Sequence, residues 1–216
     1  LGFVIVLIFV LTYLDLKNYS EEQICTLSVL TRATNPDITQ RLAPLKCTTK
    51  KICLTKGKDC PQFTGEDSSK EKLPLGDDAA AEKIAQVTAN EMYNCWKMMG
   101  EGQLNVFGGG KDDASIIEHY TTVTKFFQAR SSCMMCSRIA IAPDVSDTIL
   151  EKVNVNEYMR TKNPKNSKYT FLENFGINSY PKEFEQDILE KNGEKTREVG
   201  IIFMQILTPE KPLEAG

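Results

Sequence analysis

Apolar residues with helical spacing predict the longest helix of the chain between Asp77 and Met99. Two aspartates at its start favour a helix N-terminus, and Gly100 supplies a stop at the other end. We expect this segment to be the central helix of the domain. Its apolar stripe consists of Ala81, Ile84, Thr88, Met92, Cys95 and Met99.

Shorter helices are predicted on both sides of the central one. Ser20 and Gln23 have the spacing of a capping box, so a helix should run from Glu21 to about Ala33 and end before Asn35 and Pro36. Further helical stretches are expected at 147–153, 155–162, 171–175 and 181–191.

Three segments are typical of strands. Residues 44–56 are rich in Thr and aliphatic side chains and predict a strand or hairpin closed by a glycine, and 133–142 alternates towards its end. The nearly unbroken apolar run 199–207 predicts a central strand covered on both faces. By contrast, the polar segment 61–76 predicts an exposed loop, and 116–127 is ambiguous between strand and helix. The overall expectation is an α+β fold with the central helix packed on a small sheet.

Residues 1–14 are uncharged and strongly apolar. A helix of this length is roughly 21 Å long, against about 30 Å for the hydrocarbon core of a bilayer. Because the chain begins with Leu and no small-residue cleavage site follows the run, we expect upstream residues or processing, and a retained anchor rather than a cleaved signal peptide. A buried core helix is the alternative.

Asn18 begins an N-x-S triplet and is a candidate glycosylation site. The predicted organisation is a hydrophobic helix over 1–19 and one extracytoplasmic domain over 20–216.

Composition narrows the classes of function. The 216 residues are 41% hydrophobic and 25% charged, which is typical of a globular protein, and the net charge of −3 argues against a nucleic-acid partner. The chain has one histidine, His119, so most histidine-based triads and metal sites lack their residues. We expect no cofactor.

Seven cysteines follow the apolar segment, which favours export to an oxidising space. Their odd number leaves at least one unpaired in a monomer. At least two disulfides are expected, one within the group Cys47, Cys53 and Cys60, and one that joins Cys95 to Cys133 or Cys136.

Two local motifs suggest other chemistry without meeting its requirements. Cys133 and Cys136 have the spacing of a thiol-disulfide exchange site, but the residues after them predict a strand instead of the helix that would lower a thiol pKa. A zinc site would need a second C-x2-C pair or a suitable histidine. The glycines and lysine of 108–111 fail the phosphate-loop pattern and predict a flexible connection.

Several stretches resemble a group of uncharacterised archaeal membrane-anchored proteins from small-genome lineages. These stretches are PLKCTTKKIC at 44–53, NCWKMMGEGQLNVF at 94–107, CMMCSRIAIA at 133–142 and VNEYMRTK at 155–162. The resemblance implies a prokaryotic exported protein. It brings no activity with it, so no functional residue is carried over.

The sequence therefore favours a non-enzymatic protein of the cell surface, because no set of acid, base and nucleophile can be assembled. We expect it to self-assemble through its N-terminal helix, in the manner of a pilin, so that its partners are other copies of itself and, through residues 1–14, the membrane. One alternative is a membrane-tethered binding module of an envelope complex. Another is a thiol-disulfide redox protein that uses Cys133 and Cys136.

Overall fold

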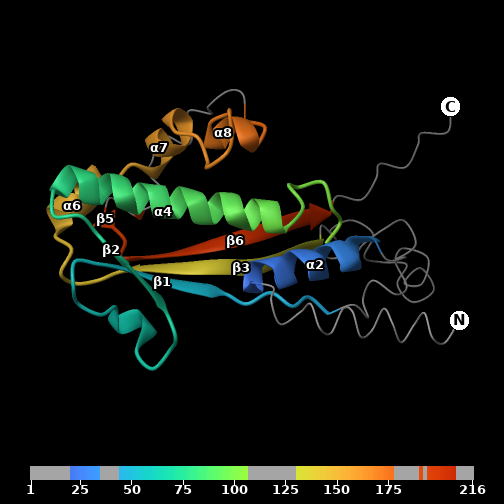
Figure 1. Ribbon diagram of the computed structural model, residues 1–216, viewed down its shortest axis with the longest axis horizontal. Coiled ribbons are helices and arrows are strands. Elements are labelled where there is room, and N and C mark those ends of the chain that lie inside the picture. Colours follow the sequence, from blue (N-terminus) through green and yellow to red (C-terminus); the bar gives the residue numbers. More distant parts are fainter. Residues whose placement is uncertain (1–19, 35–43, 107–129, 178–189, 192–193, 208–216) are drawn as a thin grey trace, which may run out of the picture. The chain divides into compact units, whose positions relative to one another are not determined.

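The computed structural model describes residues 20–34, 44–106, 130–177, 190–191 and 194–207 (Figure 1). The contacts divide the chain into two compact units. Thr49–Lys97 and Met135–Phe203 form the larger unit, and the other described residues belong to the smaller one. The fold is mixed α+β, as expected, and each unit is described by itself below.

In the described part of the chain, one sheet holds β1 (Lys50–Thr55), β2 (Ser69–Lys72), β3 (Arg130–Ile141) and β6 (Glu198–Leu207), in the order β2-β1-β3-β6. β1 pairs in parallel with both neighbours, so that Ile52 lies opposite Ser69 on one side and Ile139 on the other. β6 runs in the opposite direction. It begins where β3 ends, and there the Ile141 N–H donates to the Arg197 carbonyl over 2.8 Å.

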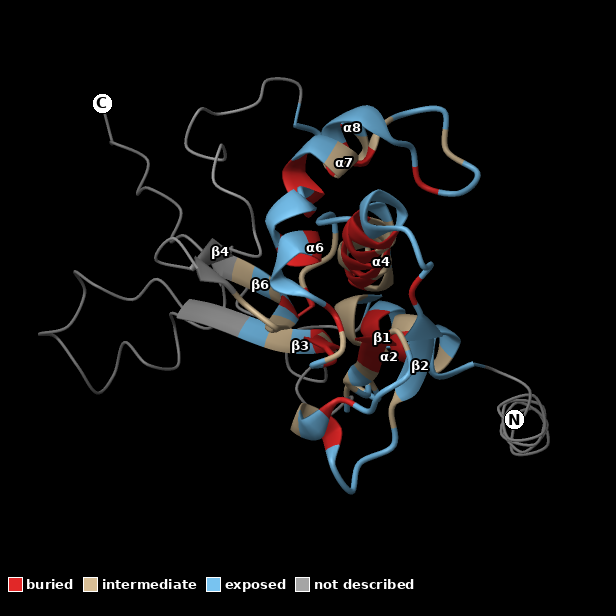
Figure 2. Ribbon diagram, turned by 90° about the vertical axis from the view of Figure 1, so that its left-hand side faces the viewer, coloured by how far each residue is buried: buried red, intermediate tan, exposed pale blue. Residues whose placement is uncertain are grey.

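The helix α4 (Asp77–Met98) lies over one face of this sheet (Figures 1 and 2) and confirms the predicted central helix. Its apolar stripe is turned inward, with Ala81, Ile84 and Cys95 buried. Facing these residues, Ile52, Leu54, Ile139 and Ile141 of the sheet are also buried. Burial of these aliphatic side chains provides the main driving force for packing α4 on the sheet.

Three short helices follow β3, namely α6 (Asp147–Lys152), α7 (Val155–Thr161) and α8 (Phe171–Asn174), and they confirm three of the predicted helical stretches. Aromatic contacts fix α8 against α4. The ring of Phe171 lies 5.8 Å from that of Tyr93, and the ring of Phe175 lies 5.3 Å from that of Trp96 in an edge-to-face arrangement.

In the smaller unit, α2 (Glu21–Thr34) confirms the helix predicted from residue 21. Its capping box is formed as expected. The Gln23 N–H donates to the Ser20 hydroxyl over 3.3 Å, and the Ser20 N–H donates to the Gln23 side chain over 2.9 Å. Cys25 and Val29 are the buried residues of this helix.

The segment before α4 confirms one prediction and corrects another. Of the strand or hairpin expected at 44–56, the strand is present as Lys50–Thr55, and it forms no hairpin because its partner β2 is parallel to it. The expected loop 61–76 contains the 3-10 helix η2 (Pro61–Phe63) and the strand β2. β2 was not predicted, because all four of its residues are polar and exposed and the sequence therefore shows no apolar alternation there.

The run 199–207 is a strand, but it is not the central one. β6 is the last strand in the order of the described sheet, and Ile202 and Met204 are 50% and 57% exposed. The expected helix 181–191 is also wrong at its end. There Glu190–Lys191 forms β4, which pairs antiparallel with β5 (Glu194–Lys195), while residues 181–189 lie outside the described residues.

Several predictions fall on residues outside the described ranges. These are the apolar helix of 1–14, the glycosylation candidate Asn18, the glycine-rich segment 108–111, the ambiguous segment 116–127, and His119. Within the described ranges, no helix has both the length and the apolar character needed to cross a membrane.

Candidate functional site

The structure contains three disulfides. Cys53 is joined to Cys60 and Cys95 to Cys136, each within the group that the sequence suggested. The third joins Cys25 to Cys47. Sequence reasoning missed Cys25 as a partner, although its position four residues before Val29 places both on one face of the capped helix. Three disulfides indicate an oxidising, extracellular environment.

The remaining cysteine, Cys133, is exposed and has a free thiol. Because Cys136 is bonded to Cys95, the C-x2-C pair forms no disulfide of its own. Both cysteines belong to β3, so the helix that supports exchange chemistry at such motifs does not follow the first thiol. Among the described residues, no group of three or more His, Cys, Asp or Glu side chains could hold a metal ion.

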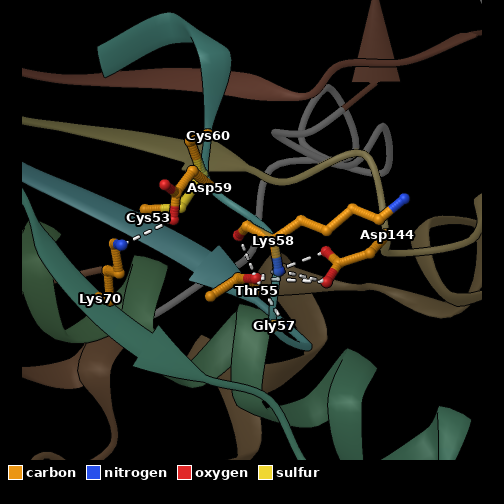
Figure 3. Close-up of polar contacts among 8 residues, drawn as sticks. All are labelled: Cys53, Thr55, Gly57, Lys58, Asp59, Cys60, Lys70 and Asp144. Atoms are coloured by element: carbon orange, nitrogen blue, oxygen red, sulfur yellow. Dashed lines mark hydrogen bonds and ion pairs between the residues drawn. A yellow bond between two sulfur atoms is a disulfide. The ribbon is translucent and has the colours of Figure 1, made fainter. Parts of the chain in front are cut away.

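The loop after β1 is built around the Asp144 carboxylate (Figure 3). The Lys58 N–H donates to this carboxylate over 2.8 Å, and the Thr55 hydroxyl lies 3.3 Å from the same oxygen. The Thr55 oxygen also accepts from the Gly57 N–H over 2.8 Å. The disulfide between Cys53 and Cys60 closes this loop, and its sulfurs are buried beside Phe63, Ala140 and Ala142.

These hydrogen bonds set the ionisation of Asp144. Burial by itself would raise the pKa of its carboxyl group. Hydrogen bonds from the backbone N–H groups of Lys58 and Lys56 and from the Thr55 hydroxyl favour the charged form and outweigh burial, so the pKa is lowered. The donors to this carboxylate come from the end of β1, the loop after it and the backbone of Asp144 itself, which makes the carboxylate a structural group.

A more open site lies along α4, beside the edge of the sheet formed by β2. It is a groove of about 460 Å³ within the larger unit. α4 lies over β1, and β2 is the next strand, at the edge of the sheet. The groove runs between α4 and β2. Four lysines and two glutamates line it, a net charge of +2 on a chain whose total charge is −3.

One ion pair lies among the residues that line the groove. The Lys50 ammonium lies 2.8 Å from a Glu91 carboxylate oxygen, and Glu91 is only 8% exposed. A buried carboxylate is stable when a cation and hydrogen bonds compensate its lost hydration. Near the β2 side, Lys83 of α4 lies 3.7 Å from Glu71, a longer and half-exposed pair.

Two other lysines of the groove, Lys97 and Lys165, have no carboxylate partner among the described residues. Lys97 lies 5.5 Å from the centre of the Tyr93 ring. Lys165 belongs to the loop between α7 and α8, where the neighbouring Asn166 adopts a positive φ of 66°. The loop is held in place because the Asn174 amide donates to the carbonyls of residues 169 and 170 over 3.0 and 2.7 Å.

One feature of the sequence, a second stripe along α4, could have indicated this groove. Beside the apolar stripe of α4, a second stripe repeats with the same helical spacing and contains two asparagines, which are poor helix formers. Nothing in the sequence indicated that β2 and the loop at Lys165 would line the same space. The residues of this second stripe are Lys83, Val87, Asn90, Asn94 and Lys97.

No family model, curated protein or solved structure matches the chain. The resemblance to archaeal anchored proteins therefore stays a prediction.

Proposed function

We propose that this protein is an exported, non-enzymatic binding module whose ligand is an anion held in the groove between α4 and β2. The observation that carries the proposal is the excess of lysines in this groove on an acidic chain, with Lys97 and Lys165 unpaired with carboxylates in the described structure. Such a local positive field attracts anionic ligands and orients them.

The groups that line the groove support binding rather than catalysis. Ammonium and amide groups donate hydrogen bonds to carboxylates, sulfates or phosphates. The buried carboxylate in the groove, that of Glu91, already has Lys50 as its partner. We therefore assign the groove side chains to recognition and orientation of the ligand.

The location proposed for this activity is the outer face of a cell. The disulfides support an oxidising compartment, and the apolar residues 1–14 would provide the anchor. Self-assembly into a pilin-like filament depends on the same 14 residues and stays a separate prediction, which electron microscopy of the full chain tests.

Calorimetric titration of the full chain with two anionic probes tests the binding proposal. The probes are an octapeptide that alternates Glu with Val and an oligogalacturonate of similar charge, and the neutral octapeptide with Gln in place of Glu is the blank. We expect Lys165→Glu to weaken anion binding roughly threefold to tenfold, since it removes one attraction and adds a repulsion.

Lys168→Glu is the matched control, because Lys168 belongs to the same loop and is exposed, but it does not line the groove. It changes the total charge equally and should leave the affinity within about twofold. Equal losses for the two variants, or no binding of either anionic probe, would contradict the proposal.

A further inference from the structure

We propose that the occupant of the groove is an extended acidic peptide that adds to the outer edge of β2 as a further strand. This inference rests on the proposed binding function and names the chemical class of its ligand. Strand addition to an open sheet edge is a common mode of peptide recognition, in which backbone bonds give affinity and side-chain pockets give specificity.

β2 is an open edge in the described part of the chain. It is the first strand in the order of the sheet and pairs with β1 alone. All four of its residues are exposed, as the pale blue ribbon in Figure 2 shows. An edge strand presents unpaired N–H and C=O groups to any extended chain that can approach it.

The register shows which backbone groups of β2 are available. In a parallel ladder, alternate residues direct both their N–H and C=O groups to the same neighbour. The Leu73 N–H donates to the Thr55 carbonyl over 2.8 Å, so Glu71 and Ser69 also direct their backbone groups towards β1. The backbone groups of Lys70 and Lys72 therefore point outward, where an added strand would meet them.

The side chains beside this edge favour an acidic strand. Ser69 and Glu71 of β2 line the groove, and α4 adds Lys83 and Lys97 on its other side. A strand added about 4.8 Å from β2 would direct every second side chain towards this helix. Acidic residues at those positions would meet the lysines, with Lys165 at the rim.

An anionic sugar polymer would satisfy the lysines, but it offers no regular ladder of donors and acceptors to Lys70 and Lys72. The open backbone edge beside the cationic groove therefore favours a peptide. Because β2 has four residues, a peptide segment of about four to six residues would pair with its full length.

Lys70→Pro tests the strand addition, because proline removes the outward N–H of Lys70 and is tolerated at an outward position of an edge strand. Lys70→Ala is the matched control. Both variants lose the ion pair between Lys70 and Asp59, which measures 2.6 Å, but only the proline variant loses the N–H donor. We expect Lys70→Pro to weaken binding of the Glu-Val octapeptide about tenfold and Lys70→Ala to change it less than twofold.

The same variants separate the possible ligands. Oligogalacturonate binding, where present, should be equal in Lys70→Pro and Lys70→Ala, because a sugar does not use the strand edge. Equal effects of the two variants on the peptide would overturn strand addition. If Lys165→Glu still weakens anion binding in that case, the proposed binding function survives and its ligand is an anion held by side chains alone.

A change in the probe makes the test independent of how the proline variant folds. Octapeptides N-methylated at every second residue lose the N–H groups on one edge only. One of the two methylation patterns should abolish binding to the unmodified protein, and the other should leave it within about threefold. Equal binding of both patterns would refute the proposal without recourse to any variant.

Discussion

Single polar residues determine the geometry at the carboxyl ends of β1 and β3. The carboxylate of Asp144 gathers donors from residues 55–58, although 86 positions separate it from Lys58 in the sequence. Another such residue is Arg197, whose guanidinium donates to the carbonyls of Ala142 and Val145 over 3.2 and 3.0 Å. Both side chains bind backbone groups where strands end, so they replace hydrogen bonds that the sheet no longer supplies.

Asp144→Asn should lower the free energy of unfolding at neutral pH by about 1–3 kcal/mol, because the loop donors lose a charged acceptor. The pKa of Asp144 is lowered in the folded protein, so the stabilisation by its charge is complete above the ordinary Asp value near 4. It is lost as the pH falls from about 4 through the lowered pKa.

Urea denaturation of both proteins between pH 7 and pH 2 measures this effect. The difference in stability between the unmodified protein and the Asn variant should be constant at neutral pH and shrink below pH 4. Asp67→Asn is the control, since Asp67 is exposed and is not among the groups that bind the Asp144 carboxylate. A difference that stays constant down to pH 2 would show that the Asp144 carboxylate does not have a lowered pKa.

At the scale of elements, helices were more predictable than strands. α2 and α4 were predicted because capping residues and apolar spacing are local signals that need no partner. β2 and β6 show the limit of the same reasoning. The position of a strand in a sheet depends on pairing with distant residues, so the polar segment SKEK became a strand and the apolar run 199–207 became an edge.

The C-terminal end of α4 depends on Gly100, which has a φ of +77°. A Cβ at this position would also collide with the side chain of Leu104. Gly100→Ala should therefore lower stability by more than the roughly 1–2 kcal/mol expected for the left-handed backbone alone. Thermal unfolding measured by circular dichroism checks this prediction.

Two other glycines help to distinguish the effect of the left-handed backbone from that of the contact with Leu104. Gly65 has the same φ of +77°, and apart from its own chain neighbours no described residue has an atom within 4 Å of the position that an alanine Cβ would take there, so Gly65→Ala should show the backbone effect alone. Gly76 has no positive φ but occupies the N-cap of α4, where its carbonyl accepts from the Ala80 N–H over 2.9 Å, so Gly76→Ala should cost about 0.5–1 kcal/mol through the cap, without a left-handed backbone effect. If Gly100→Ala and Gly65→Ala have the same effect, the contact with Leu104 does not limit the size of residue 100.

At the scale of the whole molecule, the candidate site is a product of tertiary structure. Lys50, Lys97 and Lys165 come from a strand, a helix and a loop that are far apart in the sequence, and a lysine alone predicts no groove. The disulfides were more accessible to prediction, because few cysteines are available and each needs a partner in an oxidising compartment. Even so, the disulfide between Cys25 and Cys47 could not be predicted without knowing that α2 lies next to residue 47.

The three disulfides close separate loops that do not overlap along the chain, so their effects on the unfolded state should be nearly independent. Cys95 and Cys136 are 41 residues apart, Cys25 and Cys47 are 22 apart, and Cys53 and Cys60 are 7 apart. In the chain-entropy account, a longer closed loop restricts the unfolded chain more strongly.

Replacing Cys95 and Cys136 together by alanine should therefore destabilise the protein by about 4 kcal/mol, against about 2.5 kcal/mol for Cys53 and Cys60. All four residues are buried, so the loss of packing is similar in the two double variants and the difference between them reports on loop closure. Urea denaturation under oxidising conditions measures both, and after full reduction the two variants should approach the stability of the reduced parent. A larger loss for the 53–60 pair would show that these disulfides act mainly through the folded core, where Cys53 and Cys60 pack beside Phe63, and not through the unfolded chain.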